Sequence, residues 1–325
     1  MTIRFRAASQ TAAILVCGTA LLSAGCGRYS ISSLKAAKAF KDGNAAYQLK
    51  EWKKAAERYE VVVQNDSARQ TSPGFNIAFF FLGNSYDQLY KPAKQGDPQN
   101  DQYIHKAIEN YQKAADNISD PKWKKSSLEY LAAAYGSDKL NDPAKAEPVY
   151  KEIIAIDPSS PENYLALAKL YEDAGRYDDA EAQYAKAKQV KPNDATVLAA
   201  LAGYYNRQGD FDKTIDALQQ AAALEPNNPE GYHRVATFYW EKANKDYRLS
   251  PAQKHDYIMK GLGMEDKALS LNPDYMEAMT YKNILLRLEA NGEKDPKRQK
   301  ELLDEADKLR NKVIDAQNKK RTGKG

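Results

Sequence analysis

Three prolines recur at one spacing in the middle of the chain, since the interval from Pro158 to Pro192 equals the interval from Pro192 to Pro226. The small and apolar residues around them keep the same period, so that the stretch 167–187 is matched, one interval later, by 201–221. A fixed period of about 34 residues is typical of stacked helix-turn-helix repeats. One such repeat cannot bury its apolar face alone, so it stacks on its neighbours and leaves an extended surface for another macromolecule.

The order of residue types within one period resembles the tetratricopeptide repeat (TPR). The resemblance is fullest over residues 161–194, where all ten characteristic positions match: Tyr164, Leu167, Ala168, Tyr171, Gly175, Tyr177, Ala180, Tyr184, Ala187 and Pro192. Small residues allow the helices to approach closely, and the proline ends the second helix. The resemblance implies an all-α fold, a right-handed TPR solenoid of about seven helix-turn-helix repeats over residues 35–318.

The remaining repeats depart from the pattern in two ways. Repeat one lacks the closing proline and has Ser67 there, whereas repeats two and six carry the insertions 91–106 and 241–256. Within the insertions, Asp97-Pro98 and Ser250-Pro251 are typical helix starts, which have a capping side chain followed by proline. We therefore expect the insertions to lengthen the second helices and to project from one rim. This rim is either a second binding surface or tolerated surface decoration.

Residues 1–25 have the pattern of a signal peptide. Arg4 and Arg6 precede an apolar run over 12–24, which is too short to span a bilayer comfortably. The small residues that lead into Cys26 resemble a bacterial lipobox, although Ser23 stands where the commonest boxes have leucine. An ordinary cleaved signal and an uncleaved signal anchor are the alternatives.

The lipobox resemblance implies that Cys26 is acylated and becomes the mature N-terminus, followed by a lipidated tether over residues 26–34. Such acyl chains would hold the protein on a membrane, facing the periplasm. Gly27 follows the cysteine in place of the aspartate that retains enterobacterial lipoproteins at the inner membrane. The expected location is therefore the bacterial cell envelope, with the outer membrane favoured over the inner.

The charges of the chain are nearly balanced, with 48 basic and 44 acidic residues. Nucleic-acid binding needs basic residues clustered on one face, so we expect no nucleic-acid partner. The residues 319–325 form a basic tail, and we expect this tail to be disordered and solvated.

The sequence offers no pattern for catalysis. Its three histidines are His105, His233 and His255, and none has a second histidine or a cysteine at metal-ligand spacing. His233 lies at a position that faces the groove in TPR proteins, but no orienting carboxylate is evident in the sequence. A glycine-rich phosphate loop and a nucleophile motif are also missing. We therefore expect no enzyme activity, catalytic residue, metal or cofactor.

The resemblance also implies where a protein or peptide partner would bind. In TPR proteins, positions 2, 5, 6, 9, 12 and 13 of the first helix line the concave groove, and we call these the groove positions. The candidate groove residues in this chain are Phe40, Asn44, Tyr47, Phe80, Phe81, Asn84, Asn206, Arg207, Arg234 and Trp240. Ordinary solvated surface is the alternative interpretation of this set.

Two features of the candidate groove carry specific expectations. Phe80 and Phe81 follow Phe79, and a helix cannot bury three successive side chains on one side, so at least one ring should reach the groove. Asn44 and Asn84 both occupy position 9, where their amides could bond the backbone of an extended peptide.

The leading hypothesis is a lipid-anchored periplasmic scaffold that binds another protein in cell-envelope assembly or secretion. One alternative is a structural spacer or oligomerisation module that leaves the groove unused. A carrier of a glycan or another small ligand is the second alternative. The oligomeric state and the identity of the partner stay open.

Overall fold

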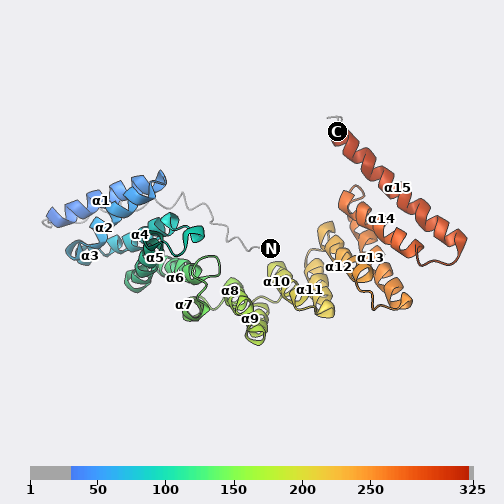
Figure 1. Ribbon diagram of the computed structural model, residues 1–325, viewed down its shortest axis with the longest axis horizontal. Coiled ribbons are helices and arrows are strands. Elements are labelled where there is room, and N and C mark those ends of the chain that lie inside the picture. Colours follow the sequence, from blue (N-terminus) through green and yellow to red (C-terminus); the bar gives the residue numbers. More distant parts are fainter. Residues whose placement is uncertain (1–30, 322–325) are drawn as a thin grey trace. The chain divides into compact units, whose positions relative to one another are not determined.

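The computed structural model describes residues 31–321, and every regular element in this range is helical (Figure 1). It contains fifteen α-helices and two short 3-10 helices, so the expected all-α fold is confirmed there. The chain divides into two compact units, of which the first ends at Ala134 and the second begins at Tyr135. The predicted signal peptide and Cys26 lie outside the described residues.

The first compact unit contains repeats one and two and most of the first helix of repeat three. Its elements are α1 (Ile31–Gln48), α2 (Trp52–Val63), α3 (Asp66–Thr71), η3 (Pro73–Asn76), α4 (Ile77–Leu89), η4 (Pro92–Lys94), α5 (Pro98–Asn117) and α6 (Pro121–Tyr135). The helices pair in sequence, because α1 packs on α2 and α4 packs on α5, while α2 also packs on α4.

Glycine allows these pairs to approach closely. Gly43 and Gly83 occupy position 8 of repeats one and two, and a Cβ atom there would lie 2.9 Å from a ring carbon of Tyr59 or Tyr111. Both tyrosines occupy position 24 of the same repeats and are fully buried. The ring of the large residue at position 24 therefore packs directly against the glycine at position 8 of the same repeat.

An extra helical segment separates repeats one and two, which the repeat pattern did not predict. Because repeat one lacks its closing proline, the chain forms α3 and η3 before α4 begins. The side chain of Asn65 caps α3 by accepting from the backbone N–H of Ala68 at 3.1 Å. The Nδ2 of Asn65 also donates to the carbonyl oxygen of Ser32 at 2.7 Å, which ties this segment to the first turn of α1.

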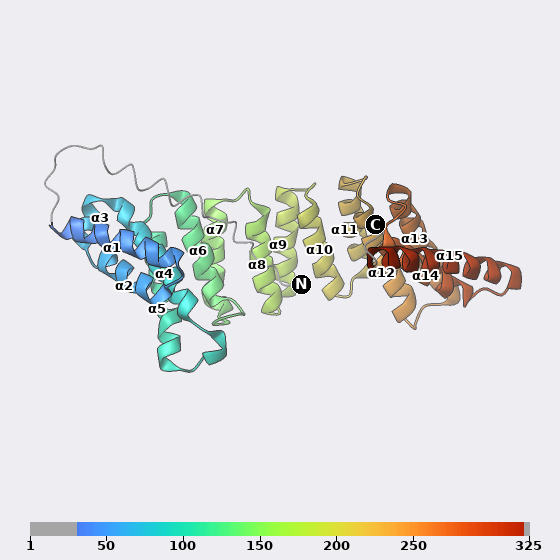
Figure 2. The ribbon, with the colours of Figure 1, turned by 90° about the horizontal axis from the view of Figure 1, so that it is seen from above.

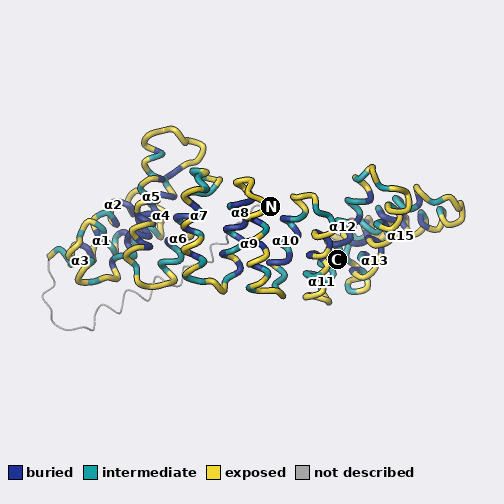
Figure 3. Tube along the Cα trace, turned by 90° about the horizontal axis from the view of Figure 1, so that it is seen from below, coloured by how far each residue is buried: buried dark blue, intermediate teal, exposed yellow. Residues whose placement is uncertain are grey.

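The second compact unit contains the repeats that fit the pattern best. Its helices are α7 (Pro143–Ile156), α8 (Pro161–Asp173), α9 (Tyr177–Val190), α10 (Ala195–Arg207), α11 (Phe211–Leu224), α12 (Pro229–Lys245), α13 (Pro251–Leu271), α14 (Met276–Ala290) and α15 (Pro296–Arg321). The pairs α8–α9, α10–α11, α12–α13 and α14–α15 pack as hairpins (Figure 2). Buried residues lie where these helices meet, and the connecting turns are mostly exposed (Figure 3).

The prediction that the insertions lengthen the second helices is confirmed. α5 has 20 residues and α13 has 21, whereas α9 and α11 have 14 each. Asp97 and Ser250 cap the two lengthened helices, and a proline follows each of them. The loop before α5 is organised by buried Asn100, which bonds the backbone of Lys91 on both its N–H and its carbonyl oxygen.

Two predicted boundaries need correction. α1 begins at Ile31, so the part of the predicted tether over 31–34 is helical. α15 continues to Arg321, so Lys319, Lys320 and Arg321 extend a helix and are not a disordered tail. Within residues 31–321, no helix is both long and apolar enough to cross a bilayer.

Candidate functional site

The groove candidates of the first compact unit are largely covered by neighbouring side chains. Phe80 is 4% exposed and Phe81 is 8% exposed, and Phe79 is buried as well. The expectation that at least one of these rings reaches the groove is therefore wrong. The reason is that aromatic rings cover α4 from both sides: Phe80 meets Trp123 and Tyr130 of α6, with centroids 5.2 and 5.3 Å away, whereas Phe81 meets Tyr47 and Tyr59.

The asparagines at position 9 are engaged inside the protein. The hydroxyl of Tyr47 donates to Asn84 Oδ1 at 2.6 Å, and Asn84 Nδ2 donates to the hydroxyl of Tyr111 at 3.3 Å. In repeat one, the hydroxyl of Tyr59 donates to Asn44 Oδ1 at 2.8 Å. Asn84 is buried, so its amide joins helices of this unit rather than facing a guest peptide.

The hydroxyls of Tyr47 and Tyr111 stay neutral at physiological pH. Burial, aided by the nearby Tyr130 and the charge of Asp87, raises the pKa of Tyr47 to about 12. Burial likewise raises the pKa of Tyr111, whose hydroxyl donates to Asp87 Oδ2 at 3.1 Å. Phe40 completes the cluster, since its ring lies edge-on to those of Tyr59 and Phe75. These residues therefore form a structural network, in which Phe40, Asn44 and Tyr47 remain half-buried.

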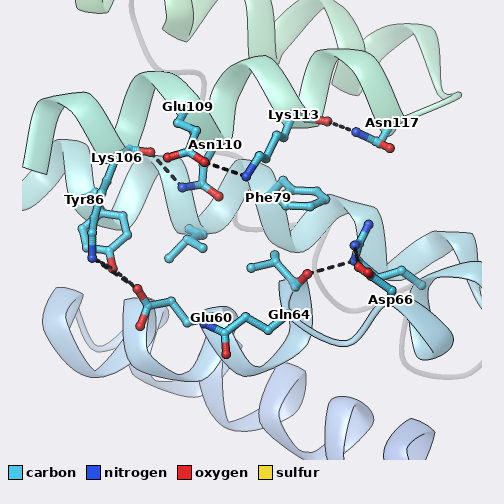
Figure 4. A pocket seen from close by; sticks show the side chains of 13 residues that line it. Glu60, Gln64, Asp66, Phe79, Tyr86, Lys106, Glu109, Asn110, Lys113 and Asn117 are labelled. Carbon is cyan, nitrogen blue, oxygen red and sulfur yellow. Dashed lines mark hydrogen bonds and ion pairs between the residues drawn. The ribbon is translucent and has the colours of Figure 1, made fainter.

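A pocket of about 450 Å³ opens elsewhere in the first compact unit, between α2, α4 and α5 (Figure 4). Buried Phe79 and Leu82 contribute apolar surface to it, and three acidic and three basic side chains also line it. The lining residues are Glu60, Val63, Gln64, Asp66, Arg69, Phe79, Leu82, Tyr86, Lys106, Glu109, Asn110, Lys113 and Asn117.

The charges of this pocket are paired with each other. Lys113 lies 2.6 Å from Glu109, and Lys106 lies 3.5 Å from Glu60, while Arg69 pairs with Asp66. The hydroxyl of Tyr86 joins the Lys106 pair, and burial together with the hydrogen bond to Glu60 raises its pKa to about 12. The pocket therefore offers no excess of either charge to select a ligand.

The groove candidates of the second compact unit are more open. Asn206 and Arg207 of α10 and Arg234 of α12 are exposed, and Trp240 of α12 is half-buried. The groove positions 5, 6 and 9 that precede Asn206 on α10 hold the small residues Ala199, Ala200 and Gly203. These three residues are half-buried.

Arg207 is held by a buried carboxylate. Its Nε lies 2.5 Å from Glu172 Oε1 and its Nη2 lies 3.0 Å from Glu172 Oε2, which is a two-point pair. The hydroxyl of Tyr184 donates to the same carboxylate at 3.1 Å. Burial opposes ionisation of Glu172, but the hydrogen bond and charge of Arg207 outweigh it and lower the pKa. Arg207 is thus fixed in place while about half of its side chain stays exposed.

His233 has an orienting carboxylate that the sequence did not reveal, so the earlier interpretation of this residue is wrong. Its Nδ1 lies 2.9 Å from Oε1 of Glu265, and Glu265 is 0% exposed on α13. Burial raises the pKa of Glu265, against the smaller opposite effect of His233. The available signal was that Glu265 occupies position 24 of repeat six, where other repeats carry a large ring or leucine such as Tyr184 and Leu218.

Aromatic rings surround His233 on the first helices of repeats six and seven. The rings of Tyr275 and Tyr281 lie edge-on to the imidazole, with centroids 5.3 and 5.2 Å away. Trp240 lies edge-on to Tyr281 at 5.2 Å. We call His233, Trp240, Tyr275 and Tyr281 the α12–α14 aromatic cluster. Each of its members is half-buried.

The described residues contain no group of three or more histidine, cysteine or acidic side chains placed to hold a metal ion. The arrangement can offer partly exposed rings, fixed guanidinium groups and amides, which are the side chains that recognise other macromolecules.

The repeats can be compared with known sequence families. Residues 139–204 and residues 195–238 each match a profile described as tetratricopeptide repeat. Residues 139–238 therefore carry tetratricopeptide repeats. The second match begins at the residue where the repeat period places the start of TPR five, and TPR four lies wholly within the first match. No curated protein matches the chain.

Solved structures resemble parts of this chain. A MamA protein is 22% identical over 61% of this chain and 94% of its own, with a TM-score of 0.42. A tetratricopeptide repeat protein from Parabacteroides merdae is 14% identical over 84% of this chain and 99% of its own, with a TM-score of 0.47. YrrB, described as a TPR protein with an unusual peptide-binding site, is 15% identical over 66% of this chain and 94% of its own, with a TM-score of 0.38.

Proposed function

We propose that this chain is a scaffold that binds a protein partner through the α12–α14 aromatic cluster and the adjacent Arg234. The observation that carries the proposal is the composition and exposure of this surface. Trp, Tyr and Arg are the residues that most often dominate the energy of protein interfaces. Here Arg234, Trp240 and Tyr281 lie at groove positions of α12 and α14, which pack on each other, and Tyr275 directly precedes α14.

The proposed site differs from the pocket of the first compact unit in the residues that it offers. In the pocket, acidic and basic groups pair with each other, and the rings of Phe80 and Phe81 in the first compact unit are buried. In the aromatic cluster, Trp240 and Tyr281 are half-buried, and exposed Arg234 pairs, among residues 31–321, with Glu230 of the same helix at 2.9 Å. Such an exposed pair is weak, so a partner can replace it at little cost.

We further propose that the scaffold is lipid-anchored and faces the periplasm, with a role in cell-envelope assembly or secretion. The support for this part is the lipobox-like run into Cys26 and the charged and apolar segments that precede it. Acylation predicts that a fatty-acid analogue labels the full-length protein in cells and that Cys26→Ser abolishes the labelling. Persistent labelling of this variant would contradict the proposed anchor.

Site-specific photo-cross-linking in cells tests the binding surface. A photoreactive residue at Thr237, which occupies a groove position between Arg234 and Trp240, should yield a recurrent protein adduct. The same residue at exposed Met259 of α13 is the matched control and should not yield it. Adducts that form equally from both positions, or from Met259 alone, would refute the assignment of the surface.

Substitution then tests the individual residues. Trp240→Ala should weaken binding of the captured partner by about 30-fold, which corresponds to about 2 kcal/mol for an interface hot spot. Because Trp240 also packs within its own unit, Arg234→Ala serves as a second variant without a core contact. Unchanged affinity in both variants would exclude this surface as the binding site.

A further inference from the structure

The outer face of α1 combines exposed aliphatic residues with lysines. The buried residues of this helix are Ala36, Ala39, Gly43 and Ala46, which face the rest of the unit. On the other side, Ile31 is 75% exposed, Leu34 is 56% exposed and Leu49 is 70% exposed. Lys35, Lys38 and Lys41 are exposed as well. We call these six residues the α1 outer face.

The α1 outer face forms one stripe. At about 100° per residue, Ile31, Leu34, Lys38 and Lys41 fall within an arc of about 80°, and Leu49 directly follows the last residue of α1. Lys35 lies near the edge of this arc, as does the carboxylate residue Asp42, which is half-buried. Among the residues that the structure describes, none of the three lysines has an ion-pair partner. The face therefore carries an unneutralised positive charge beside exposed apolar side chains.

We propose that the α1 outer face lies on an anionic phospholipid surface. A helix with aliphatic residues and lysines on one exposed face suits the boundary between headgroups and acyl chains. Each lysine near such a surface gains from its negative potential. A second copy of this chain is a poorer occupant, because it would bring the same three lysines against these.

The short connection to Cys26 supports a membrane rather than a protein as the occupant. Ile31 is five residues after Cys26, which corresponds to at most about 18 Å of extended chain. This step rests on the proposed acylation, because an anchored Cys26 would hold the start of α1 within that distance of the headgroups. The start of α1 is also fixed to its unit, through the bond from Asn65 to the carbonyl oxygen of Ser32.

Vesicle binding by the acyl-free protein tests the proposal separately from the anchor. The mature chain, residues 26–325 with Cys26→Ser, should sediment with vesicles that contain phosphatidylglycerol but not with pure phosphatidylcholine vesicles. High salt should release it, because screening weakens the attraction. Failure to bind the anionic vesicles would overturn the inference and leave the acylation of Cys26 untouched, since the labelling experiment measures that independently.

Charge reversal identifies the face. Lys35→Glu combined with Lys38→Glu and Lys41→Glu should lower vesicle affinity by at least about 100-fold, because each lysine contributes a factor of about five. The control carries the same charge change at exposed positions of the second compact unit, as Lys191→Glu, Lys294→Glu and Lys297→Glu. An equal loss in both triple variants would mean that net charge alone drives binding, and this would overturn the assignment.

A fluorescent probe separates lipid contact from protein contact. The mature chain with Cys26→Ser has no other cysteine, so Leu34→Cys can be labelled uniquely with an environment-sensitive dye. Its emission should shift to the blue on phosphatidylglycerol vesicles, whereas the dye on Met259→Cys should not respond. An unchanged emission at position 34 on vesicles that do bind the protein would place the membrane contact elsewhere and refute the inference.

Discussion

Gly83→Ala measures how tightly the position 8 glycine and the position 24 tyrosine are fitted in repeat two. The new Cβ would lie 2.9 Å from Cδ1 of Tyr111 and 3.1 Å from the carbonyl oxygen of Ala107. The ring cannot easily withdraw, because Tyr111 is fully buried and its hydroxyl is bonded to both Asp87 and Asn84. In the Gly83→Ala variant, the helix backbones, the ring of Tyr111, or both must therefore shift.

The expected magnitude is the difference between two opposed effects. Alanine in a helix is favoured over glycine by about 1 kcal/mol, whereas forcing an extra carbon into a well-packed core costs about 1–3 kcal/mol. From this difference we expect Gly83→Ala to lower the free energy of unfolding by about 1 kcal/mol. Gly263→Ala is the matched control, because Gly263 is also inside a helix but has no atom within 4 Å of the added carbon. This control should raise the free energy of unfolding by up to about 1 kcal/mol.

Urea unfolding followed by far-ultraviolet circular dichroism measures both variants against the unmodified chain. Repeat proteins do not always unfold in one step, so the midpoint and the slope of each transition should be compared as well. Adding Tyr111→Leu to Gly83→Ala should reduce the penalty of the alanine, because leucine leaves room for the new methyl group. A midpoint for Gly83→Ala at or above that of the unmodified chain would refute the close fit.

Two further predictions concern pH. Hydrogen bonds from Lys151, Arg176 and Tyr171 outweigh partial burial and lower the pKa of Glu147 to about 2. The ionised Glu147 should therefore stabilise the fold fully above pH 4.5, and this contribution should fade as the pH falls towards 2. Glu147→Gln should flatten the acid-unfolding curve between these pH values, and an unchanged curve would contradict the prediction. Burial raises the pKa of Glu265 above its usual 4.5. The free energy of unfolding of the unmodified chain should therefore be highest, relative to that of Glu265→Gln, below pH 4.5, and this advantage should disappear as the pH rises through the folded-state pKa. A difference that is constant with pH would show that the carboxyl does not titrate.

The sequence predicted the helical pairs well because the repeat pattern describes contacts inside one hairpin. It matched Tyr171 and Tyr184 to the repeat pattern, and both are buried. The prolines after Asp97 and Ser250 marked the starts of the lengthened helices. These features depend on neighbours within a single repeat, where one period contains the whole arrangement.

The groove of the first compact unit could not be predicted in the same way. Whether Phe80 is exposed depends on Trp123 and Tyr130, which lie on α6, the first helix of the next repeat. Repeat periodicity says which side of α4 these rings are on, but not what the next repeat places against that side. Sequence therefore identified candidate positions, whereas side-chain size in the following repeat decided which of them are covered.

The His233–Glu265 pair is best understood as a variation on a polar link that several repeats share. In repeats one, two and four the tyrosine at position 24 donates its hydroxyl to the first helix, to Asn44, Asp87 and Glu172 respectively. In repeat six position 24 supplies the carboxylate, and the first helix supplies the imidazole. The link between the two helices is kept while the acidic group changes sides. A buried acidic group is costly without its partner, so replacing the tyrosine at position 24 by Glu265 requires His233 opposite it. His233 therefore helps to hold the α12–α13 hairpin together and also belongs to the α12–α14 aromatic cluster.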